Sequence, residues 1–142
     1  MISFFRMTAL NLPRLTAAAG VALILAVGLI HLWEAPAHFG AAPYLGVLFV
    51  ANFVASLVSA VGILRGSKTW GWSFGALVCG LSLVAYLWSR AIGLPGLAEA
   101  VGDWDEPLGS FAMMTEGLFL VGYSTVMTGI AVAAPERRHW HD

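Results

Sequence analysis

Four long apolar stretches constrain this sequence more than any other feature. They cover roughly residues 15–33, 45–64, 70–92 and 109–134. Crossing the apolar core of a bilayer takes about 20 residues of helix, so each stretch is long enough for one crossing. Only 11% of the 142 residues are charged, against about 25% in soluble domains. The sequence therefore predicts an all-α, integral membrane four-helix up-and-down bundle, forming one transmembrane domain over residues 1–142.

The basic residues predict the orientation of this bundle. One side of the predicted membrane carries Arg6, Arg14, Arg65, Lys68, Arg137 and Arg138. Lys and Arg near crossings accumulate in cytoplasmic segments, so we expect both termini in the cytoplasm. The two links on the other side carry the carboxylates Glu34, Glu99, Asp103, Asp105 and Glu106. The non-cytoplasmic face is therefore predicted to be acidic.

Proline positions suggest where the first crossing ends. Proline disfavours helix at the residue before it, here Ala35, so the first helix is predicted to stop before Pro36. The link to the second helix would then be a short turned segment ending at Pro43. An alternative is that residues 1–37 form a cleaved signal peptide, because Ala35-Pro36-Ala37 has the small-x-small form of a cleavage site.

One polar side chain on each predicted helix falls in the non-cytoplasmic half of the membrane. These are His31, Asn52, Arg90 and Glu116. Charged groups in a membrane usually face the bundle interior and pair. Side chains lean toward the start of their helix, which brings Arg90 and Glu116 together from antiparallel helices. We therefore predict an Arg90–Glu116 ion pair.

Helical spacing also predicts which faces point inward. On the third stretch these residues are Gly71, Gly75, Cys79, Ser82, Tyr86 and Arg90, and on the second they are Asn52, Ser56 and Ser59. Small residues on these faces would permit close approach of helices. The polar layer has two readings: it fastens four helices that gain little hydrophobic association in lipid, or it forms a functional site.

The most concrete functional reading is a metal site. Its candidate ligands are His31, Glu34, His38 and Glu116, with Met113 and Met114 nearby. Imidazole with thioether would suit copper, and imidazole with carboxylate would suit zinc or iron. Methionines in apolar helices more often fill space than bind metal.

No serine or cysteine lies in a recognisable nucleophile pattern, so the sequence gives no reaction class and favours a non-enzymatic protein.

The segment Ser89-Arg90-Ala91-Ile92-Gly93-Leu94-Pro95-Gly96, with His31 before it and Glu116 after it, resembles a group of small bacterial four-helix membrane proteins that has no established activity. The resemblance covers roughly residues 29–120. It rests on a histidine ending helix one, a Ser-Arg-x-x-Gly-Leu-Pro segment and a glutamate in helix four. This chain has Ala37 where the group has glutamate. The resemblance implies a multi-pass protein of the bacterial cytoplasmic (inner) membrane.

Three functions remain open at this point. The leading one is a non-enzymatic accessory or assembly subunit of a larger membrane complex, since the apolar stretches occupy most of the chain. The second is a metal- or cofactor-binding membrane protein with its site in the outer half of the bundle. The third is a small transporter or an oligomeric channel. The expected partners are the lipid bilayer, other membrane subunits or copies of itself. No nucleic acid is expected, because the net charge is -1 and no basic stripe is present.

Overall fold

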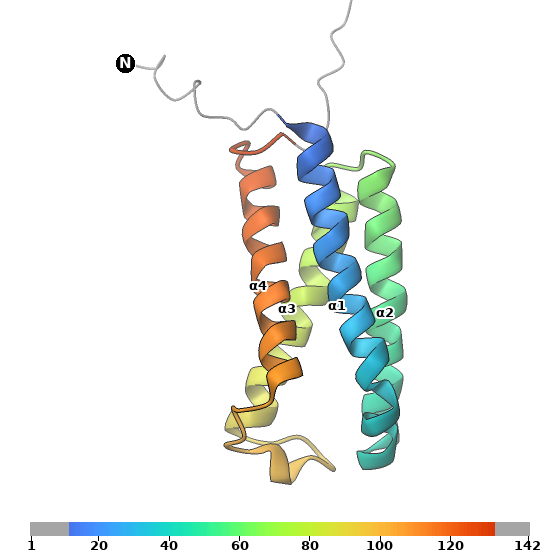
Figure 1. Ribbon diagram of the computed structural model, residues 1–142, viewed down its shortest axis with the longest axis vertical. Coiled ribbons are helices and arrows are strands. Elements are labelled where there is room, and N and C mark those ends of the chain that lie inside the picture. Colours follow the sequence, from blue (N-terminus) through green and yellow to red (C-terminus); the bar gives the residue numbers. More distant parts are fainter. Residues whose placement is uncertain (1–11, 133–142) are drawn as a thin grey trace, which may run out of the picture.

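A computed structural model describes residues 12–132, and these residues form an antiparallel bundle of four helices without sheets (Figure 1). The helices are α1 (Pro13–Ala41), α2 (Pro43–Leu64), α3 (Trp70–Ala91) and α4 (Pro107–Met127). A short 3-10 helix, η2 (Ala98–Ala100), lies in the connection between α3 and α4. We call the end where α1 begins and α4 ends the proximal end, and the opposite end the distal end. The predicted all-α four-helix architecture is confirmed.

Within the described residues, three helices are long and apolar enough to cross a membrane: α1, α2 and α3. The fourth helix is of similar length, with 21 residues, but it is less apolar. It includes the polar residues Ser110, Thr115, Glu116, Tyr123, Ser124 and Thr125. Many apolar side chains on the outside of the bundle are exposed. This arrangement is typical of a protein whose solvent is lipid, because lipid gives no reason to bury them.

The close-packed core lies in the proximal half of the bundle. It consists of Ile24, Val27, Ala60, Ile63, Trp72, Cys79, Phe119, Val126 and Ala131. The rings of Trp72 and Phe119 stack with 5.4 Å between centroids, and Trp72 also packs on Gly20. Gly20 leaves room on α1 for the indole ring, so the ring is buried.

Small residues bring α2 and α3 into close contact next to the turn that joins them. A Cβ atom on Gly71 would lie 2.7 Å from the backbone carbon of Gly62. One turn further along α3, a Cβ on Gly75 would lie 2.5 Å from the hydroxyl of Ser59. That hydroxyl donates to the Gly71 carbonyl at 2.8 Å. The expected inward faces of both helices are confirmed, and this close contact is within one chain.

Helix α1 does not stop before Pro36. It runs for 29 residues, with Pro36 in its interior, which gives roughly 40 Å at about 1.5 Å per residue. The segment after Pro36 is held against α2, because Phe39 packs on Gly46 and the ring of His38 stacks on Phe49. This packing compensates for the backbone hydrogen bond that proline removes. The prediction that helix one ends before Pro36 is wrong.

Pro43, rather than Pro36, ends this helix. Ala42 is extended, with φ −154° and ψ 117°, as expected for a residue before proline. Pro43 then occupies the first turn of α2, where a missing N–H costs nothing. The predicted signal-peptide alternative would place a cleavage site inside this continuous helix.

Replacing Pro36 with alanine is expected to stabilise the bundle. The new N–H at position 36 would donate to the free carbonyl of Leu32 and add about 1 kcal/mol to the free energy of unfolding. Thermal unfolding in detergent, followed by circular dichroism, measures the change. Pro43→Ala is the matched control and should give a change within about 0.5 kcal/mol. An N–H in the first turn of a helix has no carbonyl of that helix to bond. Unchanged stability of Pro36→Ala would contradict a continuous α1.

The other boundaries of the helices agree with the predicted ones within two residues, except at the end of α4. That helix was predicted to reach Ala134, but it ends at Met127. Gly129 adopts φ +75°, and Ala131 donates its backbone N–H to the Thr125 carbonyl at 3.0 Å. A left-handed glycine terminates helices in this way. Residues 1–11 and 133–142, including Arg6, Arg137 and Arg138, lie outside the described residues.

Candidate functional site: a cavity in the distal half

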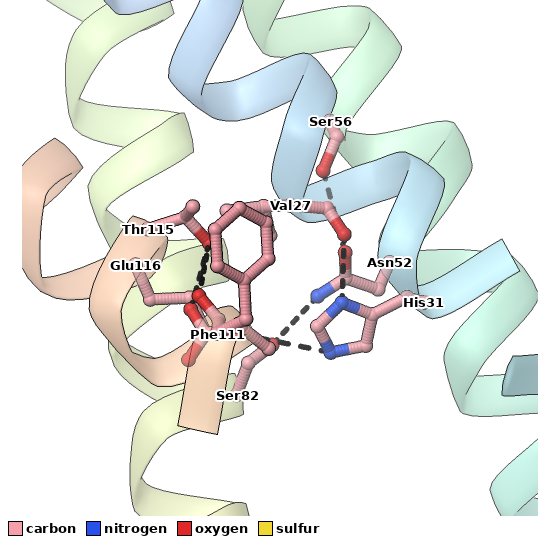
Figure 2. Close-up of polar contacts among 9 residues, drawn as sticks. Val27, His31, Asn52, Ser56, Ser82, Phe111, Thr115 and Glu116 are labelled. Atoms are coloured by element: carbon pink, nitrogen blue, oxygen red, sulfur yellow. Dashed lines mark hydrogen bonds and ion pairs between the residues drawn. The ribbon is translucent and has the colours of Figure 1, made fainter. Parts of the chain in front are cut away.

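A cavity of about 430 Å³ lies between the helices in the distal half of the bundle. Its walls include His31 from α1, Asn52 from α2, Arg90 from α3 and Glu116 from α4. The structure therefore brings all four predicted polar residues to one cavity. Figure 2 shows His31, Asn52 and Glu116 extending toward the middle of the bundle from three different helices. The volume of the cavity is within the range of small-molecule pockets, about 300 to 1,000 Å³.

A single hydrogen bond fixes the orientation of His31. Its Nδ1 lies 2.8 Å from the backbone carbonyl of Val27 (Figure 2). A carbonyl only accepts hydrogen bonds, so Nδ1 carries the proton and donates it. The other ring nitrogen, Nε2, then faces Glu116 and lies 3.7 Å from a carboxyl oxygen. This nitrogen is available as an acceptor, or as a second donor once the ring is protonated.

Glu116 is one of the most buried side chains of the bundle, with 2% of its surface exposed. Within residues 12–132 its carboxyl group makes no hydrogen bond, and the distance to His31 is longer than a hydrogen bond. The neighbouring Thr115 donates instead to backbone carbonyls of its own helix, at Phe111 and Ala112. A buried carboxyl group without hydrogen bonds is costly, so this group is a strong candidate for contacting a ligand.

Asn52 has a structural role. Its side-chain amide donates to the Ser82 hydroxyl of α3 at 2.6 Å, and its oxygen accepts from the Ser56 hydroxyl at 3.3 Å. The two bonds use one donor and one acceptor of the amide. The bond to Ser82 connects α2 to α3, and the bond from Ser56 lies within α2. Asn52 therefore fits the reading in which the polar layer holds the helices together.

Arg90 does not pair with Glu116. Its guanidinium group, on a residue that is 7% exposed, forms an ion pair with Glu106, the residue that precedes α4. It also lies 3.8 Å from a carboxyl oxygen of Asp103 and donates to the Ala100 carbonyl at 3.4 Å. The predicted Arg90–Glu116 ion pair is wrong.

The fold of the α3–α4 connection explains why. Gly102 donates its backbone N–H to the Arg90 carbonyl at 2.9 Å, so the acidic connection turns back over the end of α3. The Tyr44 hydroxyl donates to the Pro95 carbonyl at 2.6 Å and attaches the same connection to α2. The carboxylates of Glu106 and Asp103 thus come within reach of the long arginine side chain. The nearby carboxylates, and not the direction in which the arginine side chain leaves its helix, therefore determine the partner of Arg90.

The four candidate metal ligands do not come together as one set. Among the described residues, no three His, Cys, Asp or Glu side chains form a group that could hold a metal ion. His31 faces Glu116, whereas the Glu34 carboxyl lies beside that of Glu106. His38 uses Nδ1 in a contact with the Glu34 backbone carbonyl at 3.0 Å. Copper, zinc or iron binding gains no support from this geometry.

The predicted thioether ligands are also separated. Met113 lines the cavity, but Met114 lies on the exposed side of α4. Adjacent residues of a helix point about 100° apart, so both could not face one site. The pair therefore does not form a thioether ligand set.

Several residues of the cavity were not singled out from the sequence as site residues. Phe49 lies between the two histidines, with ring centroids 4.9 Å from His31 and 3.9 Å from His38. The Tyr86 hydroxyl is buried and has no hydrogen-bond partner among the described residues. Glu106 was predicted only as part of an acidic link. Its position four residues after Gly102, at the start of a helix, gave no signal that it would face Arg90.

Exposed apolar residues of α2 and α3 in the cavity wall indicate an opening between these two helices. Its walls there are the apolar residues Leu48, Ala51, Leu81 and Ala85, which are also exposed on the outside of the bundle. The two helices are in contact at Gly62 and Gly71, and the last bond across them toward the distal end is Asn52–Ser82. From these contacts and exposed residues we infer a gap with apolar edges between α2 and α3 beyond this bond. The cavity therefore combines a polar interior with an apolar entrance.

No protein-family model matches this chain, and no curated protein or solved structure is significantly similar to it. The resemblance to small bacterial four-helix membrane proteins thus stays a prediction.

Proposed function

We propose that this protein is a non-enzymatic membrane protein that binds a small amphipathic molecule in the distal cavity. The observation that carries the proposal is one cavity of about 430 Å³ with a polar interior and an apolar entrance. Ligand pockets combine mostly apolar walls with a few placed polar groups in this way. His31 and Glu116 supply the polar groups, and Leu48 and Leu81 supply apolar walls.

The proposal includes a placement in the bacterial cytoplasmic membrane, with four crossings and both termini in the cytoplasm. The described basic residues at the proximal end, Arg14, Arg65 and Lys68, support a cytoplasmic proximal face. The distal connections are acidic, which fits a non-cytoplasmic face. In this placement the gap between α2 and α3 faces the acyl chains, and a lipid-soluble ligand would enter through it.

Binding of simple amphiphiles tests the proposal. Radiolabelled octylamine, 1-octanol and octanoate share one tail length and differ in their polar groups. Equilibrium dialysis against the protein in phosphatidylcholine nanodiscs, with empty nanodiscs subtracted, should give saturable binding of at least one of them. Linear uptake of all three probes would contradict a binding cavity.

A cavity-filling variant locates the binding. Ala55→Phe places a ring in the cavity, because Ala55 is part of its wall, and should weaken binding of the probe about tenfold or more. Val54→Phe is the control, since Val54 is exposed on the outside of α2. Ala51→Phe fills the same cavity from an exposed position and serves if Ala55→Phe fails to fold. Equal binding by the filled variants and the control would contradict the location.

A further inference from the structure

The charge of the cavity wall indicates which ligands the cavity accepts. Three carboxyl groups line the cavity, those of Glu34, Glu106 and Glu116, against one guanidinium group, that of Arg90. The histidines His31 and His38 are the remaining titratable nitrogen groups of the wall. The Glu34 and Glu106 carboxyl groups lie side by side and can share one proton, and Arg90 compensates the charge that remains on them. With both histidines neutral, an ionised Glu116 then gives the wall an excess of negative charge. An anionic ligand would meet repulsion there.

The positive charge of Arg90 is already compensated. Its guanidinium pairs with Glu106 and lies 3.8 Å from Asp103. A second carboxyl group, that of Glu34, lies beside Glu106. Arg90 therefore has no charge left to attract an anion or to neutralise Glu116.

Glu116 is the carboxyl group without such compensation. It is nearly fully buried and makes no hydrogen bond to any residue in the described part of the chain. The nearest nitrogen, Nε2 of His31 at 3.7 Å, is an acceptor in the neutral ring, because Nδ1 holds the proton. Two acceptors thus face the same point of the cavity, and a donor that carries positive charge would satisfy both.

Aromatic rings also line the cavity. Phe49 packs against His31, and Tyr44 and Tyr86 also line the cavity. Arg90 already lies 4.9 Å from the centroid of the Tyr86 ring, so one cation–aromatic contact exists in this wall. Faces of aromatic rings attract cations, and they do so most strongly where water is excluded.

We infer that the ligand is a lipophilic amine, whose ammonium group contacts the Glu116 carboxylate and Nε2 of His31 while its apolar part extends toward the gap between α2 and α3. This inference rests on the proposed binding function and adds the charge and orientation of the ligand. The ammonium supplies the missing donor and the missing positive charge at once. A neutral alcohol supplies only the donor, and a carboxylate supplies neither.

The three octyl probes separate these cases, because they differ in charge at neutral pH. We expect octylamine to bind at least about tenfold more tightly than 1-octanol, and octanoate to bind most weakly. Glu116→Gln keeps the shape of the side chain and removes its charge, and should weaken octylamine binding about tenfold or more. It should leave 1-octanol binding within about threefold. Glu99→Gln is the matched control, since Glu99 is exposed in η2 outside the cavity.

The possible results distinguish the charge of the ligand, its position and the binding function. Binding of 1-octanol or octanoate as tight as that of octylamine would overturn the inferred charge and leave the proposed binding function standing. Tight octylamine binding that Glu116→Gln does not weaken would overturn the inferred position of the ammonium group. Saturable binding of no probe would overturn the proposed function itself. If Glu116→Gln does not fold, the order of the three probes on the unaltered protein still tests the charge.

Discussion

Replacing Gly71 with alanine is expected to lower the free energy of unfolding by about 3 kcal/mol, the upper end of the range for overpacking. The added Cβ would lie 2.7 Å from backbone atoms of both Gly62 and Ile63. Backbone atoms cannot move aside as the end of a side chain can, so the two helices would have to separate. The Ser59 hydroxyl would then lose its bond to the Gly71 carbonyl.

Gly80→Ala is the matched control on the same helix. Apart from the neighbouring backbone of α3 itself, no atom lies within 4 Å of a Cβ at Gly80, so alanine there should raise stability by up to about 1 kcal/mol through its helix propensity. Titration with SDS in mixed micelles, followed by circular dichroism, measures both variants. Equal effects of the two substitutions would show that α2 and α3 are not in close contact at Gly71.

Replacing Arg90 with glutamine is expected to lower the free energy of unfolding by about 3 kcal/mol, because the carboxyl groups gathered around it lose their compensating charge. Glu106 would lose its ion pair, and Glu34 would then lie beside an unpaired carboxylate. The same unfolding titration measures the loss. A change below about 1 kcal/mol would contradict a structural role of this arginine.

A double-mutant cycle identifies the partner of Arg90. Arg90→Gln and Glu106→Gln should show a coupling energy of about 1 kcal/mol or more, as residues in one network do. Arg90→Gln and Glu116→Gln, the pair predicted from the sequence, should be additive within about 0.5 kcal/mol. Stronger coupling to Glu116 than to Glu106 would restore the sequence-based ion pair.

The helices were predictable because their signals are local. Apolar stretches of about 20 residues and the Gly93-Leu94-Pro95-Gly96 stop gave α2 and α3 within two residues of their observed bounds. The end of α1 was not predictable in this way, since Pro36 stays helical only through the packing of His38 and Phe39 on α2. The burial of Trp72 likewise depends on a glycine of another helix, Gly20.

The sequence predicted which residues line the candidate site, but it did not predict which of them pair with each other. Depth along four antiparallel helices placed His31, Asn52, Arg90 and Glu116 at one level, and all four line the cavity. Their partners depend on how the α3–α4 connection folds, and helical spacing carries no information about that. The accessory-subunit and transporter hypotheses stay predictions, because no contact in the described residues distinguishes them.

The packed core of the proximal half forms the floor of the distal cavity. Val27 lies one turn before His31, and Phe119 lies about one turn after Glu116, and both are fully buried. Phe119 stacks on Trp72 directly below the polar groups. In this conformation the packed side chains of Val27, Phe119 and Trp72 therefore separate the Glu116 carboxyl group from the proximal end of the bundle.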